Sequence, residues 1–139
     1  MYIKIVYATM TQHTKKLADY IAKDMNLTAE DVKNNPKVGK ADVLIMGTGI
    51  YSGNISEDLI NYVKTLNKGD VKKAIIFIDS SSGKDASADL KTLLKEKKID
   101  VYPEVFTCKA QWLFFNRKHP DEADCVFLKK FVEDALKKL

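Results

Sequence analysis

Short apolar runs alternate with amphipathic segments through most of the chain. The runs are nearly continuous, which is typical of parallel strands buried on both faces, whereas the segments between them repeat apolar residues at helical spacing. Strand-like runs occupy 3–6, 42–47 and 73–79, and helix-like segments occupy 17–25, 55–66 and 88–95. This alternation predicts a doubly wound α/β fold, with a parallel sheet, right-handed crossovers and helices on both faces.

Other segments give weaker or more local signals. Residues 26–40 contain few aliphatic side chains, so a short strand and a turn of helix are both open for Ala29 to Val32. Residues 101–108 are expected to form the last strand, with Pro103 near its start. Asn54 with Glu57 three positions later resembles an N-cap pair for the helix that follows.

The C-terminal part of the chain predicts one long helix. Residues 119–122 (HPDE) place a proline and acidic residues where helices usually begin. The expected buried stripe of this helix consists of Phe127, Leu128, Phe131, Ala135 and Leu139. The apolar cluster Trp112–Phe115 precedes it and is expected to fold back onto the protein.

The loop after the first strand contains the most distinctive polar pattern. It reads Thr9-Met10-Thr11-Gln12-His13-Thr14 and leads directly into an amphipathic helix. Backbone N–H groups in the first turn of a helix have no partner within the helix, and the helix dipole adds positive potential there. The loop is therefore either a phosphate cradle or a hydroxyl-rich helix cap.

The run IVYATMTQHTKKLADYI, residues 5–21, resembles the signature of the flavodoxin family. In that family an apolar pair, an aromatic residue and a T/S-x-T-G-x-T loop hold the phosphate of FMN. Thr9, Thr11 and Thr14 match the hydroxyl positions, whereas Gln12 stands where the family usually has glycine. The resemblance implies a five-stranded parallel sheet in the order 2-1-3-4-5, FMN as cofactor, and one flavodoxin-like domain over residues 1–139.

In that strand order the ligand lies at the switch point, beside the loops that follow strands 1 and 3. The second of these loops, residues 48–54, resembles the family's flavin-binding segment, which implies that Tyr51 stacks on the ring and Gly53 provides a flexible peptide. Tyr51 as core filler is the alternative. The expected cofactor-binding residues are Thr9, Met10, Thr11, Gln12, His13, Thr14, Thr48, Gly49, Ile50, Tyr51, Ser52, Gly53, Asp79, Ser80, Ser81, Ser82 and Gly83.

Composition and charge narrow the class of protein. With 45% hydrophobic and 30% charged residues, the 139-residue chain has an ordinary globular composition. Its net charge of +4 comes from lysines spread beside acids, which does not favour nucleic-acid binding. No apolar run is long enough to span a membrane, and no signal peptide precedes the first strand, so a cytoplasmic location is expected. Cys108 and Cys125 lack metal-site spacing and are expected to be reduced thiols, and no metal is expected.

The leading hypothesis is an FMN-binding electron-transfer protein, either a carrier or a small flavin-dependent reductase. Its expected partner is a redox protein or a small planar acceptor, with the chain a monomer or weak homodimer. Because the chemistry resides on the flavin, no catalytic side chain is expected. The alternative is a flavodoxin-fold interaction module that has lost FMN, which Gln12 favours. A receiver domain and a dinucleotide-binding fold are excluded, since the chain lacks the acidic cluster of the one and the G-x-G-x-x-G of the other.

Overall fold

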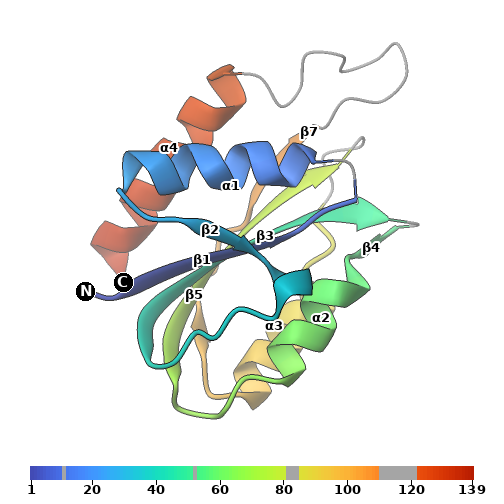
Figure 1. The fold of residues 1–139 in the computed structure, drawn as a ribbon, viewed down its shortest axis with the longest axis vertical. Helices are drawn as coiled ribbons and strands as arrows, with labels where there is room; N and C mark the ends of the chain where they lie inside the picture. Colours follow the sequence, from blue (N-terminus) through green and yellow to red (C-terminus); the bar gives the residue numbers. More distant parts are fainter. Residues whose placement is uncertain (11, 52, 81–84, 110–121) are drawn as a thin grey trace.

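A twisted parallel sheet forms the centre of the computed structural model, which describes residues 1–10, 12–51, 53–80, 85–109 and 122–139 (Figure 1). Its parallel strands are β1 (Ile3–Ala8), β2 (Ala29–Asp31), β3 (Ala41–Tyr51), β5 (Val71–Ser80), β6 (Asp100–Val101) and β7 (Phe106–Lys109). The order is β2-β1-β3-β5, with β6 and β7 both paired to the far side of β5. Since β6 and β7 together stand for the fifth strand, the predicted order 2-1-3-4-5 is confirmed.

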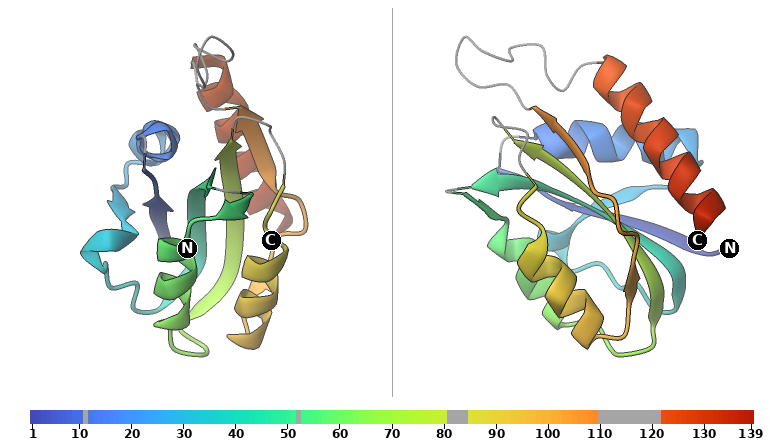
Figure 2. Two further views of the ribbon diagram at one scale, coloured as in Figure 1. Left: turned by 90° about the vertical axis from the view of Figure 1, so that its right-hand side faces the viewer. Right: turned by 180° about the vertical axis from the view of Figure 1, so that it is seen from behind.

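Two pairs of helices cover the two faces of the sheet, as the views in Figures 1 and 2 show. The helices are α1 (His13–Asp24), α2 (Glu57–Lys64), α3 (Ala88–Glu96) and α4 (Glu122–Lys138). Alternate strand residues point to opposite faces, so Ile5 and Tyr7 pack with α1 and α4 while Val6 and Ala8 pack with α2 and α3. Burial on both faces explains the continuous apolar runs.

At the edge strand of the sheet, the chain forms both the short strand and the turn of helix that were left open for residues 29–32. β2 pairs with β1 over three residues, and a short 3₁₀ helix, η1 (Val32–Asn34), follows at once. The Asp31 carboxylate accepts a hydrogen bond from the Lys33 N–H at 2.9 Å and so caps η1. Val32 is buried, which fixes this segment against the core.

The last strand differs from the prediction because it is interrupted. The expected strand over residues 101–108 is divided into β6 and β7, with Pro103 between them. A proline has no N–H to donate to the ladder, and it also restricts the residue before it. The Tyr102 N–H still reaches the Ala74 carbonyl at 2.8 Å, after which pairing resumes at Phe106.

The helix after β3 is capped by a different residue from the one predicted. The Ser56 side chain accepts a hydrogen bond from the Asp58 N–H at 3.2 Å, so Ser56 is the N-cap of α2. Asn54 instead belongs to β4 (Asn54–Ile55), which pairs antiparallel with the end of β3. The predicted cap pair of Asn54 and Glu57 was wrong because β3 continues far enough to form this hairpin.

The final helix is described from Glu122 onward, so the predicted start at 119–121 and the cluster Trp112–Phe115 lie outside the described residues. Leu128 and Ala135 are buried and Phe131 and Leu139 pack against the core, as predicted, but Phe127 is 62% exposed. The buried side of α4 is set by Cys125, Leu128 and Val132, and Phe127 lies one residue, or about 100°, away from Leu128 around the helix. None of the helices in the described part of the chain is long and apolar enough to cross a membrane.

We expect Gly47→Ala to destabilise the fold by about 3 kcal/mol, the upper end of the usual cost of overpacking a core. Gly47 on β3 is the register partner of Phe77 on β5, and a Cβ atom at Gly47 would lie 2.1 Å from Cζ of the Phe77 ring. Urea unfolding followed by circular dichroism measures the change. Gly47→Ala combined with Phe77→Leu should recover part of the loss, and an unchanged midpoint in the single variant would contradict the close packing.

Candidate ligand site at the carboxyl ends of the strands

The loop between β1 and α1 turns on an internal hydrogen bond. Thr9 is buried, and its Oγ1 accepts a hydrogen bond from the Gln12 N–H at 3.0 Å. Gln12 is the N-cap residue of α1, but its own side chain makes no capping hydrogen bond. Its backbone has φ 70° and ψ 1°, the left-handed region that glycine adopts most easily. The glycine of the family signature therefore corresponds to a real conformational requirement, which Gln12 meets at a cost in backbone strain.

The amino end of α1 differs from those of α2 and α3 in the charges that the helix itself carries. No acidic residue lies in its first turn, whereas α2 has Glu57 and Asp58 and α3 has Asp89 at the equivalent place. Acids in a first turn neutralise the positive end of the helix dipole. Lys16 in the α1 sequence adds positive charge close to the loop, whereas Lys15 is paired with Asp19. This end of α1 is therefore suited to an anion.

The loop after β3 is joined to the first loop by Tyr51. The Tyr51 hydroxyl accepts a hydrogen bond from the Met10 N–H at 2.8 Å, across 41 positions of sequence. The ring is half-buried and lies against Gly49, where a Cβ atom would be only 2.6 Å from the phenol oxygen. Burial raises the pKa of Tyr51, so the phenol is neutral at physiological pH. The Tyr51 side chain is only partly buried, so part of it is exposed to solvent.

The buried Thr48 side chain stabilises the loop after β3. It is fully buried, its Oγ1 accepts from the Ser56 N–H at 3.1 Å, and its hydroxyl donates to the Gly49 carbonyl at 2.9 Å. These two bonds fix the hairpin of β3 and β4 to the start of α2. Thr48 thus holds the second loop in shape.

A buried carboxyl group closes the site on the β5 side. Asp79 is 3% exposed, and the Thr14 hydroxyl donates a hydrogen bond to its Oδ1 across 65 positions of sequence. Burial raises the pKa of Asp79 from 3.8 to about 6, although the bond from Thr14 acts in the opposite direction. Asp79 was expected near the cofactor, but neither its burial nor its contact with Thr14 was predicted. The available signal was an ionisable residue at the end of the apolar run that forms β5.

The other predicted site residues are distributed around these three. Met10 is 69% exposed, His13 is partly buried, Ile50 packs partly against the core, and Gly53 turns with φ 81°. Burial, followed by Lys16, lowers the pKa of His13, so the imidazole is mostly neutral at pH 7. Ser80 ends β5. Thr11, Ser52, Ser81, Ser82 and Gly83 lie outside the described residues.

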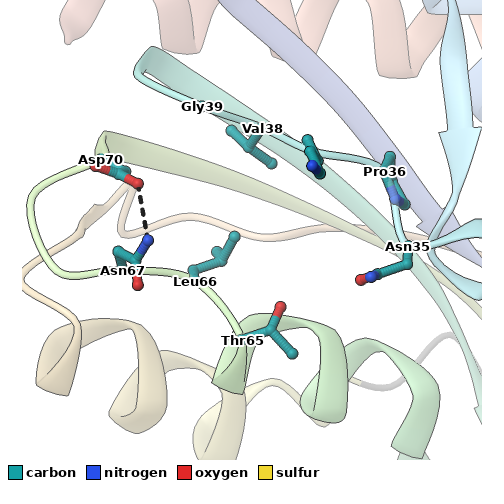
Figure 3. A pocket seen from close by; sticks show the side chains of 9 residues that line it. Asn35, Pro36, Val38, Gly39, Thr65, Leu66, Asn67 and Asp70 are labelled. Carbon is teal, nitrogen blue, oxygen red and sulfur yellow. Dashed lines mark hydrogen bonds between the residues drawn. The ribbon is translucent and has the colours of Figure 1, made fainter.

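A surface hollow of about 330 Å³ borders the two loops, lined by Met10, Tyr51 and residues 54–58. A second hollow of about 380 Å³ lies at the opposite, amino-terminal ends of the strands (Figure 3). It is lined by Asn35, Pro36 and neighbours before β3, and by Thr65 to Asp70 before β5, so it faces the amino ends of those strands. Ligands of doubly wound sheets bind at the carboxyl ends, which favours the hollow beside Met10 and Tyr51.

Metal and disulfide chemistry receive no support from the residues that the structure describes. Within them, no three His, Cys, Asp or Glu side chains are grouped as a metal site would require. Cys108 on β7 and Cys125 on α4 are both buried and are not joined in a disulfide, as expected.

The first loop is rich in hydroxyl groups and lies at a helix amino terminus, and an aromatic residue lies beside it at the switch point. These features define a doubly wound α/β protein that binds a phosphate-bearing planar ligand. The chain belongs to the flavodoxin family, because the model of the flavodoxin domain matches residues 4–110. No curated protein matches the chain significantly. Members of the family bind FMN, and membership supports an FMN-binding electron-transfer protein.

Solved structures agree with this fold. Oxidised flavodoxin 1 from Bacillus cereus is similar with a TM-score of 0.76 and 20% identity, over 99% of this chain and 98% of that one. A flavodoxin from the domain Archaea gives a TM-score of 0.72 and 14% identity, over 99% and 98%. Rubredoxin oxygen:oxidoreductase from Desulfovibrio gigas gives 0.67 and 17%, over 94% of this chain but only 34% of that one. The same domain therefore occurs both alone and as part of a longer chain.

The loop geometry fits the phosphate of FMN. The Met10 N–H donates a hydrogen bond to the Tyr51 hydroxyl, and the Gln12 N–H donates one to the Thr9 hydroxyl. Both acceptors are neutral oxygens. Hydrogen bonds to an ionised acceptor are roughly twice as strong as bonds between neutral groups. A phosphate oxygen would therefore be a stronger acceptor for these donors than the hydroxyls that they contact.

We expect Gln12→Gly to raise the free energy of unfolding by about 0.5 to 1 kcal/mol, because glycine relieves the left-handed strain while adding some freedom to the unfolded chain. Chemical denaturation measures it. Gln12→Ala keeps the Cβ atom and should stay within about 0.5 kcal/mol of the wild type. An equal gain in both variants would assign the effect to the glutamine side chain rather than to the backbone.

Asp79 should make folding stability depend on pH. The folded pKa of about 6 exceeds the unfolded value of 3.8, so its contribution is most favourable below pH 4 and is lost as the pH rises to 6 and above. The loss amounts to about 1 to 3 kcal/mol. Asp79→Asn should remove this dependence and be more stable than the wild type at pH 7 to 8, as measured by urea unfolding from pH 4 to 8.

Asp85→Asn is the matched control for that measurement. Burial raises the pKa of Asp85, but hydrogen bonds from Ser87 outweigh it, and the net pKa is lowered. Removing this carboxylate should therefore reduce stability at neutral pH, the opposite sign from Asp79. Identical effects of the two variants would show that only net charge is being measured.

Proposed function

We propose that this chain binds FMN across the loops 9–14 and 48–54 and passes electrons between the flavin and a redox partner or a small planar acceptor. When bound, FMN supplies the redox chemistry. The protein contributes binding, orientation and electrostatics. The hydrogen bond between the Met10 N–H and the Tyr51 hydroxyl supports the proposal most directly, because it places the two loops at one site.

The phosphate end of the ligand is assigned to the first loop. Its donors are the N–H groups of residues 10–14, with Lys15 and Lys16 following in sequence. The missing family glycine argued for an interaction module without FMN. Gln12 adopts the left-handed conformation that such a glycine would have, and this supports retention of the cofactor.

The ring of the flavin is assigned to the second loop. Tyr51 presents a half-buried aromatic face, and Gly49 leaves the space that its ring occupies. Aromatic stacking contributes about 0.5 to 1.5 kcal/mol beyond the burial of area. Gly53 provides a peptide with positive φ in the same turn.

Two features favour a small reductase over a carrier that acts only on proteins. The end of β5 and the segment that follows it, residues 79–85, contain no aromatic residue in their sequence to cover a second ring face. The hollow beside Met10 and Tyr51 offers about 330 Å³ next to the proposed ring position, and Met10 is largely exposed there. A planar acceptor could then approach the ring directly.

Titration of the apoprotein with FMN, followed by quenching of flavin fluorescence, tests this function, with riboflavin as the control ligand. Two or more charge-assisted hydrogen bonds to the phosphate should make FMN at least about 100-fold tighter than riboflavin. Tyr51→Ala should weaken riboflavin, which carries only the shared ring, by a factor of about 5 to 30, because Tyr51 is assigned to stack on that ring. Failure of both ligands to bind would overturn the proposal, and equal binding of the two would overturn the assignment of the phosphate.

A further inference from the structure

A carboxyl group is buried directly behind the loop that is assigned to the phosphate. Asp79 is the penultimate residue of β5, and its Oδ1 accepts the hydrogen of the Thr14 hydroxyl. Thr14 itself is fully buried in the first turn of α1. A carboxylate at this position repels a phosphate dianion and also competes with it for the same hydroxyl hydrogen.

We propose that Asp79 is a positioning residue for phosphate recognition, whose protonation releases the Thr14 hydroxyl hydrogen to the phosphate of FMN. This inference rests on the proposed function.

Thr14 and Asp79 have a limited set of hydrogen-bond donors and acceptors between them. A threonine hydroxyl has one hydrogen, and an ionised carboxylate can only accept. While Asp79 is ionised, Thr14 must donate inward, and only lone pairs remain for a phosphate. Once Asp79 is protonated, its O–H donates to Thr14 Oγ1, and the threonine hydrogen can turn to the ligand. The proton thus reverses the direction of one buried hydrogen bond and removes one negative charge.

Among the described residues, the surroundings of Asp79 leave protonation as its route to neutrality. Its strand neighbours are Gly49 on β3 and Cys108 on β7, and the Tyr51 phenol is the other titratable group whose interaction with it is resolved. Within the described part of the chain, no lysine, arginine or histidine forms an ion pair with Asp79. His13, the first residue of α1 and the neighbour of Thr14, has a lowered pKa because of burial and Lys16 and is mostly neutral at pH 7.

The charge state of Asp79 changes within the physiological range. Burial places its pKa at about 6, so both forms are populated near neutral pH. Bound phosphate favours the protonated form and should raise this pKa further. FMN binding is therefore coupled to the uptake of a proton by Asp79, and the affinity for FMN should fall as the pH rises above 6. The total fall should be tenfold for each unit by which bound FMN raises the pKa of Asp79.

The test compares FMN dissociation constants of the wild type and Asp79→Asn between pH 5.5 and 8.5. The amide keeps the shape of the carboxyl group, carries N–H donors and has no charge to titrate. From pH 5.5 to 8.5 the wild type should lose about tenfold more affinity than Asp79→Asn, and the variant should bind more tightly at pH 8.5. The FMN phosphate and His13 titrate in both proteins, so the difference between the two profiles isolates Asp79. Asp85→Asn should follow the wild-type profile.

A second measurement keeps the test valid if Asp79→Asn does not fold. The carboxyl ¹³C resonance of Asp79, followed by NMR in the wild type, should give a pKa at least one unit higher with FMN than without it, and riboflavin should leave it unchanged. Parallel pH profiles, or a carboxyl pKa unmoved by FMN, would overturn this inference alone. Failure of FMN to bind at any pH would overturn the proposed function instead.

Discussion

The parallel pairing of β1, β3 and β5 is the constraint on which the rest of the structure depends. Ala8 is level with Thr48, and Gly49 is level with Asp79, so three chain segments end at one edge of the sheet. The loops that follow are far apart in sequence but adjacent in space because of this register. A shift of one residue would exchange the two faces of a strand and bury its other set of side chains. The buried alternation of Ile5 and Val6 between the two helix layers therefore fixes the site as well as the core.

Packing and backbone geometry limit which residues can occupy this edge. The Phe77 ring lies where a side chain at Gly47 would extend, and the Tyr51 ring occupies the same kind of space at Gly49. Both glycines lie on β3, two residues apart, so one strand leaves space for rings from β5 and from its own end. The rings of neighbouring residues thus determine where β3 has glycine. At the end of β3, the Tyr51 hydroxyl contacts the Met10 N–H.

Patterns of local period allowed much of the fold to be predicted. Continuous apolar runs indicated the buried strands, and helical spacing indicated α1 to α4, because both depend on burial alone. Details that depend on competition between neighbours were missed. β3 extends into a hairpin and gives Ser56 the cap role, Pro103 divides the last strand, and Phe127 lies outside the buried side of α4.

The sequence predicted where the loops of the candidate site lie, but not the contacts between its side chains. The two loops were assigned correctly to one edge, since strand order alone brings them together. The bond between Thr14 and Asp79 could not be predicted, because it depends on the depth at which β5 ends relative to α1. The roles of Thr11, Ser52 and residues 81–83 stay predictions.

Two unfavourable local arrangements of the described chain lie at this edge, although Asn26, Asn35 and Lys98 adopt a left-handed backbone elsewhere. Gln12 adopts a left-handed backbone without glycine, and Asp79 is buried without a cation from the described residues. Each costs folding free energy, and neither improves the packing of the core around it. Strain and perturbed ionisation concentrate at functional sites because a ligand can offset their cost and the hydrophobic core cannot. Their position at the amino end of α1 therefore supports the proposed ligand site at this edge.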